Sequence, residues 1–242
     1  GEKRTMKPKA MIRIVVDCAM TVLLMLLMAS ELLGRFAHEW IGTAMFILFI
    51  LHHILNRRWT KSLLRGRYTP CRMLQTVSAA LVLFTMCCSL VGALIMSRHV
   101  FAFLPIHGGR SFGRVAHLIG AYWGFVLMAF HLGIHWNGML AVGRRMVKPS
   151  QTRSRILRIL AAVMALYGVY AFFARSIPQY MFLRTRFVFF DYEEPIIFFF
   201  FDYLAVMISF AWLGFYAARA AQRGTKIKMR EKEAAKMQER KA

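Results

Sequence analysis

Apolar residues fall into six long blocks separated by short segments rich in Lys and Arg. A helix needs about 20 mostly apolar residues to cross a hydrocarbon core of about 30 Å. The sequence therefore predicts an all-α integral membrane bundle of six transmembrane helices, and the block at 38–55 is the shortest. The expected spans are Ile14 to Leu33, His38 to Leu55, Leu74 to Met96, Val115 to Trp136, Ile156 to Ala174 and Ile196 to Ala218.

The composition supports this class, since 58% of the 242 residues are hydrophobic and 21 are Phe. The formal net charge of +22 comes from segments between apolar blocks, which favours anionic lipid as the partner and argues against nucleic acid. With the N-terminus inside, the inward segments hold 25 Lys and Arg and the outward segments hold 7. This bias predicts a multi-pass protein of the cell inner membrane with both termini in the cytoplasm.

Two of the blocks carry histidines at the same spacing. His38 is followed by His52, and His117 by His131, each fourteen residues later. Fourteen residues of α-helix turn through about 1,400°, about 40° short of four turns, and rise about 21 Å. Each pair therefore shares one helix face at two depths, and the two helices run parallel because a single span separates them.

Histidine in hydrocarbon is costly unless it faces the bundle interior and has a partner. Imidazole is a good axial ligand for haem iron, so these pairs predict two haems stacked across the membrane, with His38 level with His117 and His52 level with His131. The inner ligands stay open, because His53 and His135 are alternatives. Histidines that serve only helix packing are the competing interpretation.

Other residues suit a porphyrin with anionic propionates. Gly42 lies one turn after His38, and Gly120 with Gly124 forms a GxxxG that brings a helix or a flat macrocycle close. Arg110 and Arg114 are candidates for the outer propionates, and Arg57 for the inner ones. The four cysteines lack the spacing of covalently attached haem, so the expected haems are b-type.

Several carboxylates near the ends of the blocks have explanations that do not involve haem. Asp17, and Glu31 near the outer end of the first span, are expected to pair with a neighbouring Arg, with a role in proton transfer or quinone contact as the alternative. Asp191, Glu193, Glu194 and Asp202 would accept protons from a quinol, or form salt bridges with Arg184 or Arg186.

Two segments resemble a known family. HEWIGTAMFILFILHHILNRRW, from His38, and HLIGAYWGFVLMAFHLGIHW, from His117, are similar to the flavinylation-associated membrane cytochromes, which resemble cytochrome b in arrangement. The resemblance covers about the first 140 residues. It implies two haems b on His38, His52, His117 and His131, and electron exchange with an extracytosolic partner that carries covalent flavin such as FMN.

We therefore expect an electron-transfer subunit that moves electrons between a quinol pool or a cytoplasmic donor and an extracytosolic redox partner. Residues 1–137 would form the di-haem core, 138–218 two further helices with an outer interfacial segment, and 219–242 a basic cytoplasmic tail. Two alternatives stay open, namely a membrane anchor without haem and a quinol-oxidising subunit with its own quinone site. Whether the subunit is itself an enzyme is left open.

Overall fold

The computed structural model describes residues 8–239, apart from 64, 66–67 and 147–149. The described residues form helices and no strand, and six of the helices are long and apolar enough to cross a membrane. These six are α1 Pro8–Met28, α2 Ser30–Leu55, α4 Pro70–Met96, α5 Arg110–Met146, α6 Gln151–Ala174 and α8 Ile196–Glu239. The predicted class, an all-helical membrane bundle with six spans, is confirmed.

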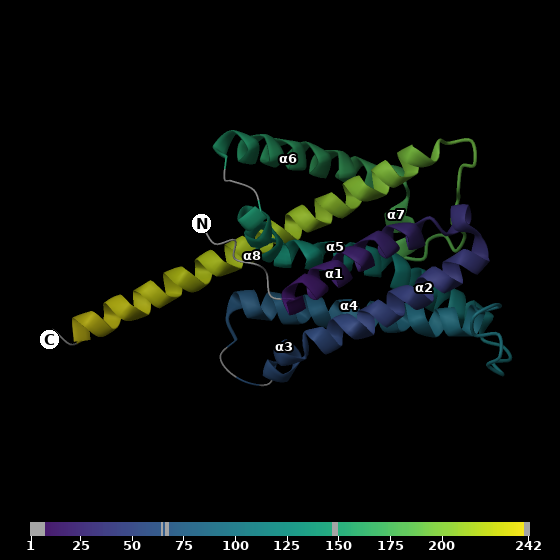
Figure 1. Ribbon diagram of the computed structural model, residues 1–242, viewed down its shortest axis with the longest axis horizontal. Helices are drawn as coiled ribbons and strands as arrows, with labels where there is room; N and C mark the ends of the chain where they lie inside the picture. Colours follow the sequence, from purple (N-terminus) through teal and green to yellow (C-terminus); the bar gives the residue numbers. More distant parts are fainter. Residues whose placement is uncertain (1–7, 64, 66–67, 147–149, 240–242) are drawn as a thin grey trace.

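Consecutive long helices run in opposite directions along the bundle (Figure 1). Both termini lie at its left end in this view, which we call the terminal end, and the connections 97–109 and 182–195 lie at the other, which we call the loop end. Two short helices complete the chain, α3 Arg57–Ser62 and α7 Ile177–Met181.

The centre of the bundle is α5, which packs along α4 on one side and along α8 on the other. Phe125 and Ala129 of α5 and Val206 of α8 are completely buried. Helix α6 covers α8, whereas α2 packs mainly on α1. Large apolar side chains on the outer faces are open, such as Leu166 at 75% exposure and Tyr170 at 67%, as expected for surfaces that contact lipid.

Local sequence explains several helix ends. The Thr69 side chain accepts a hydrogen bond from the backbone N–H of Arg72, and Pro70 occupies the first turn of α4. Ser150 caps α6 in the same way, through the N–H of Arg153. The tail predicted as a charged extension continues α8 as helix through Glu239.

The first two helices differ from the predicted spans. The first helix ends at Met28 and not at Leu33, and Glu31 lies in the first turn of α2. Gly34 has φ 72° and ψ 162°, a backbone conformation that residues with a side chain rarely adopt. Helix α2 therefore bends before it enters the segment with His38. Hydropathy alone does not place this break, because Leu32 and Leu33 continue the apolar block past Met28.

Candidate functional site

His38 of α2 and His117 of α5 face each other toward the loop end. Their ring centroids are 5.8 Å apart, and the ring planes make an angle of 77°. Nδ1 of His117 donates to the carbonyl of Ser89 in α4 at 3.0 Å, which leaves Nε2 with its lone pair. Nδ1 of His38 is buried and has no hydrogen-bond partner among the described residues. The pair thus offers nitrogens that the protein itself does not use.

The other histidines of the two helices gather toward the terminal end. The ring centroids of His131 and His135 are 4.7 Å apart, and those of His52 and His53 are 5.6 Å apart. His131 and His135 of α5 interact electrostatically with His52 of α2. The two helices therefore bring these imidazoles to a similar level of the bundle.

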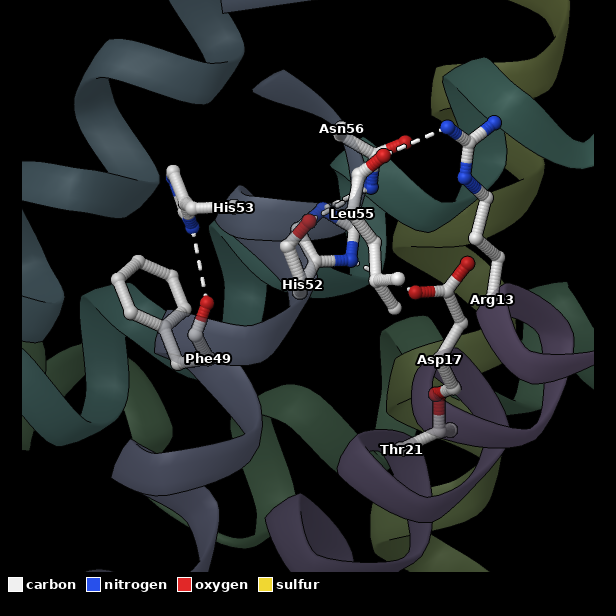
Figure 2. Close-up of polar contacts among 8 residues, drawn as sticks. All are labelled: Arg13, Asp17, Thr21, Phe49, His52, His53, Leu55 and Asn56. Atoms are coloured by element: carbon white, nitrogen blue, oxygen red, sulfur yellow. Dashed lines mark hydrogen bonds and ion pairs between the residues drawn. The ribbon is translucent and has the colours of Figure 1, made fainter. Parts of the chain in front are cut away.

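The second-helix histidines point to different sides, as Figure 2 shows. Nδ1 of His52 lies 2.7 Å from the Asp17 carboxylate of α1. His53 turns the other way and donates from Nδ1 to the carbonyl of Phe49 at 3.0 Å. Asn56 donates to the backbone carbonyl of His52 and lies 3.4 Å from its Nε2, a long contact. Ring orientation at this level is thus set by α1 as well as by α2.

His131 is held from α4, where the Ser78 hydroxyl lies 3.1 Å from its Nδ1. Nδ1 is therefore engaged in His52, His53, His117 and His131, and Nε2 is directed elsewhere. Histidines that ligate a metal almost always donate their second ring N–H to a carboxylate, a carbonyl or a similar group, which fixes the tautomer and the orientation. His117, His52 and His131 have this form, whereas Nδ1 of His38 has no hydrogen-bond partner among the described residues.

The predicted glycines lie mainly against other helices. Gly120 packs tightly on the α4 backbone at Thr85 and Ser89, and Gly124 is in ordinary contact with Thr85. Only Leu27 of α1 comes within 4 Å of a side-chain carbon placed on Gly42, at 3.8 Å. The GxxxG of α5 therefore serves the approach of α4, which was one of the two roles expected for it.

The predicted arginines lie at the two ends of the bundle. Arg110 begins α5 at the loop end, and the Arg114 guanidinium lies 5.5 Å from the ring centroid of Phe187. Arg57 begins α3 at the terminal end and is exposed.

Three polar partners were missed or misassigned from the sequence. Asp17 pairs with His52 and not, as the sequence predicts, with a neighbouring Arg. The neighbouring Arg13 instead donates to the carbonyl of Leu55 at 2.6 Å. Glu39, directly after His38, accepts hydrogen bonds from the Ser97 hydroxyl and from three backbone N–H groups at 98–100. The only signal for Glu39 in the sequence is its position directly after His38, a predicted ligand.

The third group corrects the expectation that Arg184 or Arg186 pairs with the late carboxylates. Arg175, just after α6, donates to both carboxylate oxygens of Glu194 and to Asp202, the latter at 2.8 Å. Hydrogen bonds to Glu194, and then to Asp202, raise the pKa of Arg175 above its usual range. The Tyr167 hydroxyl also donates to Asp202, at 2.6 Å.

Two further features limit what the site can be. No group of three or more His, Cys, Asp or Glu side chains in the described part of the chain could hold a bare metal ion. A hollow of about 610 Å³ is open to the surface and none of the histidines lines it; its walls are Ser150, Gln151, Ser154, Arg155 and Arg158.

Comparison of the chain with protein-family models, with curated proteins and with solved structures finds no match. The fold defines a multi-pass helical membrane protein, and the family suggested by the histidine segments stays a prediction.

Proposed function

We propose that this protein is a di-haem b-type cytochrome that carries electrons across a membrane. The observation that carries the proposal is the facing of His38 of α2 and His117 of α5, whose ring centroids are 5.8 Å apart. Nitrogen bonds of about 2 Å to a metal place each imidazole centre about 3 Å away, so two axial rings on one iron would be about 6 Å apart. The observed separation suits this arrangement.

The distance between α2 and α5 favours a haem macrocycle, rather than a bare metal ion, as the group between them. Packed helices have axes about 8–10 Å apart, and α4 with α5 follows this rule, whereas α2 makes no extended close approach to α5. The histidines nevertheless meet across that distance. A porphyrin supplies four nitrogens of its own and needs only two imidazoles, which agrees with the lack of any three-ligand cluster among the described residues.

For the inner haem, the contacts favour His52 and His131 as ligands. Both have Nδ1 engaged by a side chain from a neighbouring helix, whereas His53 donates from Nδ1 to a carbonyl of its own helix. His53 and His135 remain the alternatives. The imidazoles then hold the iron, and Ser89, Ser78 and Asp17 orient the imidazoles. Haem held by these histidines would supply one-electron exchange.

The remaining parts of the proposal concern the surroundings of the bundle. We place the terminal end in the cytoplasm of a cell with an inner membrane, because the basic residues gather there. Electrons then pass between a quinol pool or a cytoplasmic donor and an extracytosolic partner at the loop end, which the sequence resemblance suggests to be a flavoprotein. Arg110, Arg114 and Arg57 are the proposed partners of the haem propionates.

Haem content tests the proposal directly. The purified full-length chain is expected to show reduced-minus-oxidised b-type bands and two protohaems per chain, with one lost in His38→Ala and one in His131→Ala. His99→Ala and His107→Ala, in the loop-end connection, are matched controls that should keep both. A chain without haem bands would leave a membrane anchor as the function, and unchanged stoichiometry in both ligand variants would refute the assignment.

A further inference from the structure

A cavity of about 310 Å³ lies at the loop end, away from the histidine pairs. It is enclosed by the start of α2, by α7, by the connection after α7 and by the first turns of α8. This volume is near the lower limit for small-molecule sites, enough for one ring-sized head group. Its walls include Met28, Ser30, Glu31, Arg175, Gln179, Tyr180, Val188, Phe189, Phe190, Asp191, Phe199 and Tyr203.

The floor of the cavity is aromatic and rigid. Tyr180, Phe199 and Tyr203 are each at most 5% exposed. Phe199 stacks on Tyr203 with ring centroids 4.5 Å apart, and Tyr180 stacks on Tyr122 at 4.8 Å. Flat faces of this kind favour a planar ring, because offset stacking adds to the area buried.

The polar groups are placed around this floor. The Arg175 guanidinium has three of its N–H groups engaged by Glu194 and Asp202, so it is held rigidly at the cavity wall with two N–H groups left. Tyr180 accepts from the backbone N–H of Phe189 at 3.1 Å and keeps its own O–H to donate. Glu31 and Asp191 add acceptors, and Gln179 adds an amide. Donors and acceptors therefore surround one apolar platform.

The charges exclude the commonest competing ligand, a lipid phosphate. One guanidinium faces four carboxylates in and directly behind the wall, those of Glu31, Asp191, Glu194 and Asp202. An anionic head group would meet net negative charge. A cationic head group is also disfavoured, because Arg175 already occupies the face of Phe199, at 5.6 Å from the ring centroid. A neutral ring with hydroxyl or carbonyl oxygens fits best.

The entrance is apolar. Phe189 lines the cavity and is 82% exposed, and Phe187 and Ile197 nearby are 66% and 71% exposed. An aliphatic tail attached to the ring would lie along these side chains in the lipid, since the cavity has no room for it.

We propose that this cavity binds the ring of a membrane quinone or hydroquinone. The ring would lie beside Tyr180 and Tyr203, which line the cavity, with its two oxygens hydrogen-bonded to polar groups of the wall and its tail in the lipid. The site also adjoins the helix of the first histidine pair: Tyr180 of the cavity stacks on Tyr122, and Tyr122 lies five residues after His117 on α5. The inference rests on the proposed function in one respect, because it names the membrane-soluble compound with which the proposed cytochrome would exchange electrons.

Binding can be measured without any electron transfer. The full-length chain in phosphatidylcholine nanodiscs is titrated with decyl-ubiquinone in a calorimeter, and one saturable site per chain is expected. Ser30→Trp fills the cavity and should weaken binding more than about tenfold. Gln179→Leu, a milder change, should weaken it about three- to tenfold through the loss of a hydrogen bond. Ser111→Trp, an exposed serine of α5 at the same end, should bind as the wild type does.

Three outcomes would overturn the inference. They are no saturable binding, binding by Ser30→Trp and Gln179→Leu that is as tight as that of the wild type, and displacement of the quinone by glycerol phosphate. Haem is counted on the same samples. Two haems without quinone binding would refute this site alone, whereas quinone binding without haem would refute the proposed function and leave the site.

Discussion

The carboxylate of Asp17 lies 2.7 Å from Nδ1 of His52, so it sets both the orientation of that ring and the charge beside it. The Asp17 side chain is 39% exposed and that of His52 28%, so water screens the pair in part. A carboxylate in this position makes the imidazole a stronger donor to iron. The oxidised haem, with its extra positive charge, gains more from this than the reduced haem does.

Asp17→Asn should therefore raise the midpoint potential of the inner haem. The amide keeps an oxygen that accepts from His52 but removes the charge, and the difference between a charged and a neutral hydrogen bond is about 1 kcal/mol. For a one-electron couple this corresponds to roughly 40–60 mV. Spectroscopic redox titration of the purified protein measures the shift.

The proposed outer haem would provide an internal control, because His38 and His117 make no contact with Asp17 that the structure shows. Glu193→Gln, an exposed carboxylate of the loop end, is the matched substitution and should move neither potential. A shift of both haems in Asp17→Asn, or of neither, would contradict the role given to Asp17.

The sequence reveals the histidines but not the groups that hold them. Spacing along one helix is enough to place His117 and His131 on a shared face. Asp17, in contrast, is 35 residues from His52, and Glu39 is 58 residues from Ser97. Such contacts depend on how helices are packed side by side, which apolar periodicity does not specify. For the same reason Arg175 was overlooked in favour of Arg184 and Arg186, which are nearer to the carboxylates in the chain.

Among the helices, α5 depends on small residues for its two close neighbours. Gly120 meets the α4 backbone near Ser89, and Gly133 meets the α8 backbone at Ala211. Without a hydrophobic driving force between helices in lipid, such close backbone approach supplies the packing energy. A side chain at Gly133 would overlap backbone atoms that cannot rotate away.

Gly133→Leu should therefore separate α5 from α8 and destabilise the bundle. Overpacking typically costs about 1–3 kcal/mol and more where backbone must move. We expect a lower monodisperse fraction in size-exclusion chromatography after detergent extraction, and a lower temperature of thermal unfolding. Gly138→Leu is a matched control on the same helix, since nothing lies within 4 Å of a side-chain carbon placed there. Equal behaviour of the two variants would show that the α5–α8 contact is not limiting.

The number of long helices was predictable, whereas some of their ends were not. Hydrophobic length determines where lipid can surround a helix, and this holds for α4 and α6, whose C-terminal ends agree with the predicted spans. Hydropathy averaged over a span does not register a backbone turn within it, as at Ala29 and Gly34. Nor does it register where helix continues into water, as α5 does past Trp136 and α8 past Ala218.

For the whole molecule, an even number of spans places both termini on one side (Figure 1). That end also carries the larger share of basic residues, 25 against 7 in the predicted segments. Lys and Arg are retained on the cytoplasmic side during insertion. The loop end, with the His38 and His117 pair nearest to it, would then face the extracytosolic partner.

Reporter fusions test this orientation. Alkaline phosphatase, which is active only after export, should be active when fused after Gly108 or after Asp191, both in loop-end connections, and inactive when fused after Arg65 or at the C-terminus. A cytoplasmically folding fluorescent protein should show the reverse pattern at the same four positions. The inverted result would place the basic segments outside and reverse the order of the two haems relative to the membrane. It would leave the haem count unchanged, because the histidine geometry does not depend on which side the termini occupy.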